Sequence, residues 1–488
     1  MQRSNPEQDL SIGQAVTEIK ADLCVIGAGS GGLSVAAAAA AFGQSVVLIE
    51  KHKMGGDCLN YGCVPSKALI AAGKRAHIMR TSSAFGIAPV EPAIDRSAVR
   101  DHVRGVIAAI EPNDSVERFT GLGVQVIQAA GRFVDRATVM AGETRIKARR
   151  FVIATGSSPA VPPIAGLDEV PYFTNETVFD NKDAMPHLLI IGGGPIGMEM
   201  AQAHKRLGSK VTVIEGLKAL GKDDPELTAI LLQELRDEGI EILEGTKVER
   251  IAGSAGAIEV SATVGGKPSV ITGTHVLIAV GRKANISDLG LEAAGIEFQK
   301  SGITVDETLM TSNKRVFAIG DCTGGLQFTH VANYHAGIVI RRSLFRVPAK
   351  VNNALVPWVT YTEPEIANVG MTEAQAKAQQ IEHKVLRWPF HENDRAQAER
   401  ATHGHVKVVV DKKGVILGAG IVGHHAGELI NMWSLAVSQK MKIKAMTDYI
   451  VPYPTLGEVN KRAAYRYFAD FAGNPNVRRV IGLLKKLG

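Results

Sequence analysis

The chain has 488 residues, 45% hydrophobic and 21% charged, a balance that is ordinary for a soluble globular protein of about two to four domains. No apolar run approaches the roughly 18–20 residues that span a bilayer. Residues 1–20 are polar and lack a signal-peptide-like stretch, so we expect a cytoplasmic protein. The net charge of +6 is a mild excess, and no aromatic–basic cluster accompanies it, which argues against nucleic acid as a partner.

The first motif is a strand–loop–helix–strand unit near the N-terminus. An apolar strand is predicted at Leu23 to Ile26, then the glycine-rich loop 27–32 (GAGSGG), a helix whose residues 35–42 we expect in the core, and a strand at Ser45 to Ile49. Such glycines permit a tight turn, close approach of a pyrophosphate and close helix packing, while Glu50 stands where a ribose hydroxyl is held. The unit predicts a dinucleotide site, and its glycines are Gly27, Gly29 and Gly32.

Two cysteines five residues apart follow this unit, in the segment GGDCLNYGCVPSK. The four cysteines are too few for a disulfide scaffold, and neither Cys24 nor Cys322 supplies the second ligand pair of a zinc site, so we predict no metal site. The pair Cys58 and Cys63, placed beside a nucleotide site, indicates electron transfer through a disulfide. Pro65 is placed as in a first helical turn, so Cys63 would lie at a helix N-terminus, which lowers the pKa of a thiol.

The nucleotide-binding pattern recurs in the middle of the chain. A strand is predicted at Leu188 to Ile191, a glycine-rich loop at 192–197 (GGGPIG), a helix at Met198 to Leu207, and a strand at Lys210 to Ile214. Two complete units indicate two dinucleotides in one chain, the alternative being that one unit is a structural relic. The glycines of the second unit are Gly192, Gly194 and Gly197.

The residue after the last of these strands bears on the choice of nicotinamide. Glu215 would accept a hydrogen bond from a ribose 2′-hydroxyl and would repel a 2′-phosphate. The residues that follow, 216–218 (GLK), contain no arginine that could bind a phosphate. NADH is therefore predicted over NADPH.

Further strands and a change of pattern complete the chain. Residues 151–159 are predicted to form a strand that runs into a Pro-rich connector, and residues 276–282 form a parallel passage after the second unit. A further buried strand is predicted at 316–321, and it ends in a carboxylate at the edge where ligands bind in open α/β sheets. From about Val351 the pattern changes to a separate α+β domain. Its predicted elements are a hairpin at 404–410 and 415–422 and helices at 427–439 and 459–471.

The C-terminal residues 477–488 form a basic amphipathic pattern. Apolar residues recur at helical spacing, and four basic residues surround them. A helix of this kind can lie on an anionic membrane surface. The alternative is a solvated helix that packs on its own protein.

These motifs together resemble the flavin-dependent pyridine nucleotide–disulfide oxidoreductases, the family of dihydrolipoamide dehydrogenase, glutathione reductase and mercuric reductase. The resemblance covers roughly residues 20–470, and Tyr361 to Glu365 (YTEPE) looks like the opening of the family's dimerisation domain. By this resemblance the cofactor-binding residues are Gly27, Gly29, Gly32, Glu50, Ala154, Thr155, Gly156, Asp321, Gly192, Gly194, Gly197, Glu215 and Gly281.

The resemblance implies a homodimer with FAD in each subunit. Electrons would pass from the reduced nicotinamide to the flavin and on to the Cys58–Cys63 disulfide. Cys63 would face the flavin as the charge-transfer thiolate, and Cys58 would be the interchange thiol. Lys67 would lie near the flavin and pair with Glu199, and Asp321 would hold the ribityl chain.

One stretch departs from the pattern of the disulfide reductases, which carry His-x-His-Pro-Thr-x-x-Glu near their C-terminus. Residues 451–458 read VPYPTLGE, so Glu458 is kept but Tyr453 replaces the acid–base histidine. Tyr titrates near pH 10 and is mainly a hydrogen-bond donor at neutral pH, which puts fast turnover of lipoamide in doubt. In the alternative, His424 or His425 transfers the proton.

A Tyr at this place resembles mercuric reductase, although no cysteine follows Cys322 to receive a metal and no N-terminal metal-binding CxxC module is present. We predict an NADH-dependent, FAD-containing oxidoreductase that serves a thiol-reactive metal ion or a small disulfide. The alternatives are dihydrolipoamide dehydrogenase and, in another class, a membrane-associated redox sensor. The cytoplasmic protein would touch the inner membrane surface weakly through residues 477–488.

The expected fold is α/β, with two Rossmann-like domains and a C-terminal α+β dimerisation domain. The expected boundaries are 20–165 and 284–345 for the FAD domain, 166–283 for the NAD(H) domain, 346–472 for the dimerisation domain and 473–488 for the basic tail.

Overall fold

The computed structural model describes residues 17–487. Residues 1–16, part of the stretch expected to lack a signal peptide, and Gly488, the last residue of the predicted tail, lie outside the described residues. The chain divides into two compact units. Among the described residues, the first contains 17–56, 111–157 and 284–351, and the second contains 57–110, 158–283 and 352–487.

The first unit is built on a seven-stranded sheet with the strand order β3-β2-β1-β6-β5-β4, in which β18 also pairs with β6. β1 lies between β2 and β6 and is parallel to both. Its apolar end is buried on both faces, as expected of a central parallel strand. The strands are β1 (Thr17–Ile26), β2 (Val46–Glu50), β3 (Val124–Gln128), β4 (Gly131–Asp135), β5 (Thr138–Ala141), β6 (Thr144–Ile153) and β18 (Val316–Ala318).

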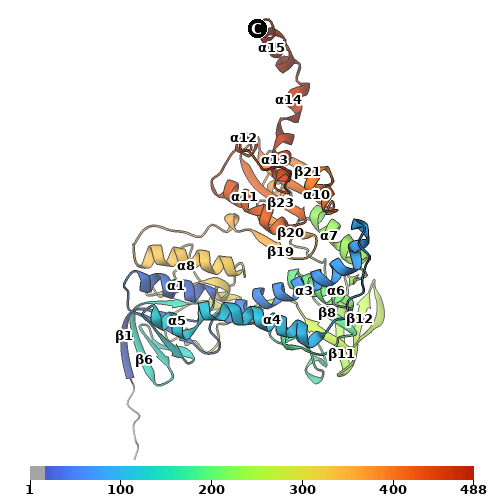
Figure 1. Ribbon diagram of the computed structural model, residues 1–488. Helices are drawn as coiled ribbons and strands as arrows, with labels where there is room; N and C mark the ends of the chain where they lie inside the picture. The colour runs from blue at the N-terminus through green and yellow to red at the C-terminus, as the bar shows by residue number, and fades with distance from the viewer. Residues whose placement is uncertain (1–16, 488) are drawn as a thin grey trace, which may run out of the picture. The chain divides into compact units, whose positions relative to one another are not determined.

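Helices α1 (Ser30–Ala41) and α8 (Thr329–Ser343) pack against each other and share one hydrophobic core with β1 and β2 (Figure 1). Small side chains on α1, including Ala36 and Ala39, allow this close approach. The expectation that residues 35–42 are all core residues is wrong at Phe42. That ring is 56% exposed and makes an edge contact with Phe345, because α1 ends just before it.

The second unit contains the second nucleotide-binding unit. Its parallel sheet has the order β10-β9-β8-β14, and an antiparallel sheet of β11, β12 and β13 accompanies it. β9 matches the strand predicted at 210–214, and α6 begins at Pro195, three residues before the predicted start. These elements are β8 (His187–Ile191), α6 (Pro195–Arg206), β9 (Lys210–Ile214), α7 (Pro225–Asp237), β10 (Glu241–Leu243), β11 (Lys247–Ser254), β12 (Ala257–Val264), β13 (Lys267–Gly273) and β14 (His275–Ile278).

Two helices that follow the cysteines belong to this second unit. Helix α3 (Cys63–Thr81) packs against α6, and α4 (Arg96–Ile110) packs against α3, while the domain boundaries expected from the sequence stay a prediction. Leu69 of α3 shares one core cluster with Met200 of α6 for this reason. The helix that begins at Cys63 is thus held by the helix of the second glycine-rich unit.

The last part of the second unit is an antiparallel sheet in the order β19-β20-β23-β22-β21. The predicted hairpin is present as β22 and β23, and α11 and α13 share its core, in which the buried Trp433 donates to Asn460 Oδ1 at 2.8 Å. These elements are β19 (Trp358–Thr360), β20 (Glu365–Gly370), β21 (His383–Pro389), β22 (His405–Asp411), β23 (Ile416–Gly423), α11 (Ala426–Ser438) and α13 (Glu458–Tyr465).

A buried ion cluster ties this sheet to α7. Lys407 of β22 is 5% exposed, and its Nζ lies 2.8 Å from Asp224 Oδ2, 2.8 Å from Glu226 Oε2 and 2.9 Å from Glu373 Oε2. Arg387 of β21 donates to both carboxylate oxygens of Glu226, at 2.6 and 2.8 Å. Three acids and two bases close together therefore join parts of the chain that are about 150 residues apart in sequence.

The chain ends in α14 (Ala469–Gly473) and α15 (Pro475–Leu484). Among residues 17–487, no helix is both long and apolar enough to cross a membrane.

Candidate redox site and cofactor cradles

The two glycine-rich loops have the same geometry. Gly27 and Gly192 adopt φ of +104° and +111°, and a Cβ on either would collide with a carbonyl oxygen of a following strand segment, Ala154 O or Ala279 O. In contrast, an added Cβ would meet nothing closer than 3.9 Å at Gly29 and nothing within 4 Å at Gly194. The open side at the second glycine leaves room for a pyrophosphate, so both loops fit a dinucleotide.

The acid at the end of the second strand of each nucleotide-binding unit makes the same hydrogen bonds in both units. Glu50 Oε2 accepts from Ala28 N at 2.7 Å and Glu215 Oε2 accepts from Gly193 N at 2.6 Å, so each acid braces its own glycine loop. Their other oxygens accept from the backbone two residues ahead, at 2.8 Å in both cases. Each carboxylate is therefore fixed beside its loop and keeps lone pairs for a ribose hydroxyl.

The predicted flavin contacts in the first unit form one hydrogen-bonded cluster. Ser157 Oγ donates to Asp321 Oδ2 at 2.6 Å. Thr155 Oγ1 donates to Asn285 O at 2.6 Å, and Asn285 Nδ2 donates back to Thr155 O at 3.0 Å. Gly156 makes the turn between these residues with φ of +67°. Ser157 thus fixes the carboxylate predicted to hold the ribityl chain, and the sequence prediction missed Asn285, which supports Thr155.

The cysteines lie on two consecutive helices. Cys58 is half-buried in α2 (Gly56–Asn60), and Cys63 is exposed at the first residue of α3, with Pro65 in the first turn as predicted. The disulfide between Cys58 and Cys63 stays a prediction. A helix start leaves backbone N–H groups and the positive end of the helix dipole beside Cys63, an environment that favours a thiolate.

Three polar side chains hold the cysteine segment in place. Asp57, next to Cys58, accepts from Arg282 Nη2 at 3.0 Å and from Asn175 Nδ2 at 3.2 Å. Asn175 also donates to Tyr61 O at 3.1 Å. The sequence prediction missed Asn175 and Arg282, although Arg282 directly follows the predicted cofactor residue Gly281.

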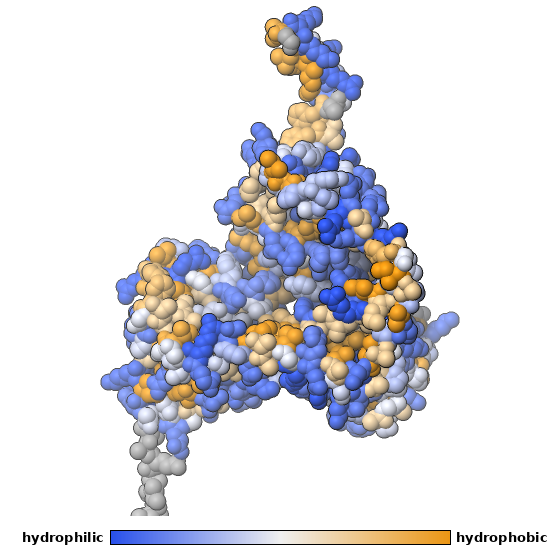
Figure 2. Space-filling model, in the orientation of Figure 1, coloured by the Kyte–Doolittle hydropathy of each residue, from blue (hydrophilic) through white to orange (hydrophobic). Residues whose placement is uncertain are grey.

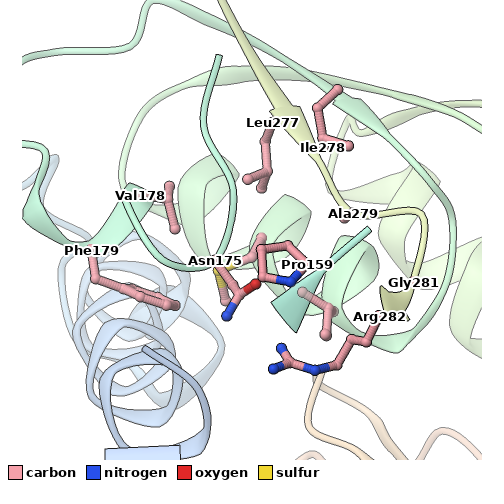
Figure 3. A pocket seen from close by; sticks show the side chains of 11 residues that line it. Pro159, Asn175, Val178, Phe179, Leu277, Ile278, Ala279, Gly281 and Arg282 are labelled. Atoms are coloured by element: carbon pink, nitrogen blue, oxygen red, sulfur yellow. The ribbon is translucent and has the colours of Figure 1, made fainter. Parts of the chain in front are cut away.

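Two of these side chains, Asn175 and Arg282, line a small cavity beside the second glycine loop. It has a volume of about 20 Å³, and Asn175 and Arg282 lie on the same side of it (Figure 3). Ile196, the first residue after Pro195 in α6, also lines it. Asn175 and Arg282 therefore contact both this cavity, beside the second glycine loop, and Asp57 in the cysteine segment.

Lys67 and Glu199 form the predicted ion pair. Lys67 Nζ lies 2.7 Å from Glu199 Oε2, and Tyr361 N donates to the other carboxylate oxygen at 2.9 Å. The ammonium also lies 4.3 Å from the centre of the Tyr361 ring, a cation–π contact. Burial, with smaller contributions from Glu199, Glu365 and Cys63, raises the pKa of Tyr361, so the phenol stays neutral. The role of the pair in catalysis remains a prediction.

Tyr453 and Glu458 do not contact each other by a hydrogen bond, and each is bonded to a different side chain. Tyr453 is 69% exposed, and its hydroxyl donates to Asp394 Oδ2 at 2.7 Å. This hydrogen bond to Asp394 raises the pKa of Tyr453 above its usual value of about 10. Glu458, at the start of α13, is paired with Arg462 at 2.8 Å instead. The family's acid-oriented histidine therefore has no equivalent in this arrangement.

The alternative acid–base histidines lie in a separate charged cluster. His424 Nδ1 lies 3.0 Å from Glu363 Oε1, and Glu363 also pairs with Lys74 at 2.9 Å and Arg206 at 3.0 Å. Burial opposes ionisation of Glu363, but the hydrogen bonds from His424 and Lys74 and the charges of Lys74 and Arg206 outweigh it and hold its pKa well below the usual range. Burial also lowers the pKa of His425. His424 is thus tied to a structural ion network, and the centre of the His425 ring lies 4.0 Å from that of His424.

The structure brings part of the predicted site together. Cys58, Cys63, Lys67 and Glu199 belong to the second unit, with the second glycine loop, Glu215 and Gly281. The first glycine loop, Glu50, Thr155 and Asp321 belong to the first unit. Within residues 17–487 the side chains form no group of three or more His, Cys, Asp or Glu that could hold a metal ion.

Comparison with known proteins gives a consistent result. Residues 21–336 match the pyridine nucleotide-disulphide oxidoreductase family, and residues 356–464 match its dimerisation domain, which supports a homodimer. A mercuric reductase of Lysinibacillus sphaericus is 34% identical over 458 residues, which cover 93% of this chain and 84% of that protein. A dihydrolipoyl dehydrogenase of Geobacillus stearothermophilus is 34% identical over 461 residues, which cover 91% of this chain and 96% of that protein.

Solved structures agree with these relatives. The Cu(II) complex of the HOCl-induced flavoprotein disulfide reductase RclA from Escherichia coli matches with a TM-score of 0.81 at 27% identity, covering 90% of this chain and 99% of that one. LpdA from Mycobacterium tuberculosis matches with a TM-score of 0.85 at 26% identity, covering 93% and 100%. The predicted fold class is confirmed. The chain belongs to the pyridine nucleotide-disulphide oxidoreductase family and is an oxidoreductase that uses FAD and NAD(P)H.

Proposed function

We propose that this enzyme oxidises NADH and delivers the electrons through Cys58 and Cys63 to a thiol-reactive metal ion of the Hg(II) or Cu(II) class. The observation that carries this is Tyr453, an exposed phenol whose hydroxyl is engaged with Asp394. Mercuric reductases at 34% identity and the Cu(II) complex of RclA support the class of acceptor.

The proton requirement separates the two kinds of acceptor. Reduction of a disulfide consumes NADH, one proton and the disulfide, and yields NAD⁺ and two thiols, so the leaving thiolate needs a proton donor. Reduction of Hg(II) to Hg(0), or of two Cu(II) to two Cu(I), consumes NADH and releases one proton with NAD⁺. A phenol with a raised pKa is a poor proton shuttle at neutral pH, so Tyr453 favours the metal ion.

The chain's own residues have defined tasks in this proposal. Bound FAD supplies the two-electron carrier between the nicotinamide and the thiols. Cys63, at the start of α3, is held as a thiolate by the helix N-terminus, and Asp57 with its partners Asn175 and Arg282 keeps the segment in place. Thiolates are strong ligands of soft metal ions, which fits an acceptor that binds at the pair.

NADH is the proposed electron donor. Glu215 lies beside the second glycine loop with both carboxylate oxygens bonded to backbone N–H groups, so its negative charge is fixed there. A 2′-phosphate at the ribose would meet this charge, whereas a 2′-hydroxyl could donate to it.

Steady-state kinetics tests the proposal. Purified holoenzyme is given NADH or NADPH, anaerobically, with thiol-buffered Hg(II), with Cu(II), or with lipoamide. We expect many turnovers with a metal ion, slow turnover with lipoamide, and a kcat/KM for NADH above that for NADPH. Rapid lipoamide reduction would instead favour a dihydrolipoamide dehydrogenase, and a single reduction without turnover would favour a redox sensor.

Replacing Tyr453 by histidine tests the proton argument directly. Because imidazole titrates near neutral pH, we expect Tyr453→His to raise kcat for lipoamide by about 10- to 100-fold and to change metal-ion turnover little. Tyr453→Phe, which removes only the hydroxyl bonded to Asp394, is the control and should leave lipoamide reduction slow. Equal lipoamide rates in the wild type and Tyr453→His would show that position 453 does not limit proton transfer.

We also propose that the cytoplasmic enzyme touches an anionic membrane through α15. No residue of this helix is buried, and its apolar side chains Val480, Ile481 and Leu484 are 50–56% exposed. Figure 2 shows the orange apolar atoms of this segment beside blue polar ones. Four basic side chains and no acid lie between residues 475 and 487, so the charge complements an anionic surface. Each basic residue near such a surface contributes about 1 kcal/mol of binding free energy.

Vesicle sedimentation tests this proposal. We expect the full-length enzyme to sediment with phosphatidylcholine–phosphatidylserine vesicles at low salt and to be released at high salt, and a chain truncated after Gly473 to stay in the supernatant. The control is the variant with Arg478, Arg479, Lys485 and Lys486 replaced by Gln, which keeps the apolar side chains. Sedimentation of the truncated chain equal to that of the full-length chain would contradict the proposal.

A further inference from the structure

A buried histidine supports the turn that carries Asp321. His335 of α8 is 6% exposed, and its Nδ1 accepts a hydrogen bond from Gly320 N at 3.2 Å. A ring nitrogen that accepts a hydrogen bond carries a lone pair, so the imidazole is neutral and its proton lies on Nε2. Burial lowers the pKa of His335 to about 4, in agreement with a neutral ring.

The turn that this bond holds is tightly packed. Gly320 has φ of +67°, and a Cβ added there would lie 3.2 Å from the Ala332 side chain on α8. A Cβ added at Gly31 of α1 would lie 3.0 Å from the Ile319 side chain and 3.2 Å from that of Ala332. The turn therefore lies between α1 and α8, and its backbone N–H at Gly320 is satisfied by the imidazole.

Asp321 follows Gly320 directly and is thus held from two directions. Its Oδ2 accepts from Ser157 Oγ at 2.6 Å, which fixes the side chain. The bond from Gly320 to His335 fixes the backbone from which that side chain projects. Loss of the second support would let the carboxylate shift while the bond to Ser157 remained.

The other ring nitrogen of His335 is the second observation. Nε2 is buried and has no hydrogen-bond partner among the described residues. A buried donor without an acceptor costs free energy, and such groups are concentrated where a ligand or an ordered water completes the structure. A ring that is bonded to the residue next to Asp321, with a donor still to be satisfied, fits a cofactor site.

We propose that His335 is a positioning residue for FAD, which orients the Asp321 carboxylate through the Gly320 N–H group. The proposal rests on the family's use of FAD and on the predicted role of Asp321, and it is independent of which acceptor the enzyme serves. Its failure would leave the metal-ion proposal unchanged.

Two substitutions of His335, by side chains of similar size, distinguish the loss of the hydrogen-bond acceptor from the loss of the ring's volume. Asn in place of His335 can present Oδ1 where Nδ1 lies now, whereas Leu offers no acceptor. We expect the holoenzyme His335→Leu to release FAD about 5- to 30-fold faster than the wild type, the effect of one lost net hydrogen bond, and His335→Asn to stay within about 3-fold. FAD release is followed by the rise of flavin fluorescence after dilution.

A spectroscopic signal and a control complete the test. We expect the visible circular dichroism of the bound flavin to change in His335→Leu and to be kept in His335→Asn. Arg341→Gln, at an exposed position of the same helix, should alter neither. Equal FAD release from the wild type and His335→Leu, or equal loss from the Leu and Asn variants, would overturn the proposal. If His335→Leu does not fold, His335→Ala gives the same comparison with Asn.

Discussion

Cys63→Ser should lower NADH consumption with Hg(II) or Cu(II) by more than about 100-fold, because a hydroxyl at the start of α3 is neither a thiolate nor one half of a redox pair. Cys58→Ser should have a similar effect on turnover. FAD content, measured by absorbance, should stay unchanged in both variants, which separates lost electron transfer from lost cofactor. NADH consumption is measured anaerobically with the metal ion in a thiol buffer.

Cys24 provides the matched control for this experiment. It is fully buried in β1, and burial raises the pKa of its thiol well above the usual range, so it forms no reactive thiolate. Cys24→Ala should therefore keep metal-ion turnover. Unchanged turnover in both Cys58→Ser and Cys63→Ser would remove the cysteine pair from the path of the electrons and would contradict the proposed function.

Lys407→Met should destabilise the protein by about 3–5 kcal/mol, since it removes the buried cation that neutralises three carboxylates. The chain would be left with Asp224, Glu226 and Glu373 close together, and with Arg387 and the exposed Lys377 as bases beside them. The free energy of unfolding is measured by urea denaturation of the holoenzyme at neutral pH.

An exposed lysine on the same carboxylate gives the control. Lys377 pairs with Glu373 at the i,i+4 spacing and is 65% exposed, so Lys377→Met should cost no more than about 0.5 kcal/mol. Equal effects of the two substitutions would show that burial of Lys407 does not matter. A small effect of Lys407→Met would mean that the carboxylates find other partners.

The same cluster predicts a dependence of stability on pH. Hydrogen bonds from Arg387 and Lys407 lower the pKa of Glu226 to about 2, and hydrogen bonds from Lys377 and Lys407 lower that of Glu373 to about 2. A carboxylate with a lowered pKa stabilises the fold fully above its unfolded value, near 4.3, and the stabilisation is lost as the pH falls toward 2. In Lys407→Met the acid unfolding transition should move to higher pH.

The nucleotide-binding units show how much local sequence can determine. A strand, a loop with three glycines and a helix are fixed by contacts within about 30 residues, so the spacing alone predicts the turn at Gly27 and its counterpart at Gly192. The two strands at 188–191 and 210–214 are found within one residue of their predicted bounds. The start of α3 at Cys63 is likewise determined by nearby residues, since Pro65 lies in the first turn.

The supports of the site could not be predicted in this way. Asn175 lies 118 residues from Asp57, and Asp394 lies 59 residues from Tyr453, so no spacing in the sequence links either pair. The place of residues 57–110 in the second unit likewise depends on the packing of α3 against α6, which no local spacing shows.

The sequence by itself determined the family, the two dinucleotide-binding units, the cysteine pair and the departure at Tyr453, because each depends on residue type and short spacing. The tertiary structure alone decided which side chains hold them: Asp394 for Tyr453, Arg282 for the cysteine segment, and His335 for the turn before Asp321. The contacts of Arg282 and Asp394 join residues far apart in the chain, and that of His335 joins a turn to the helix after it. All three form only when strands and helices bury their apolar faces together, a cooperative event that no local pattern encodes.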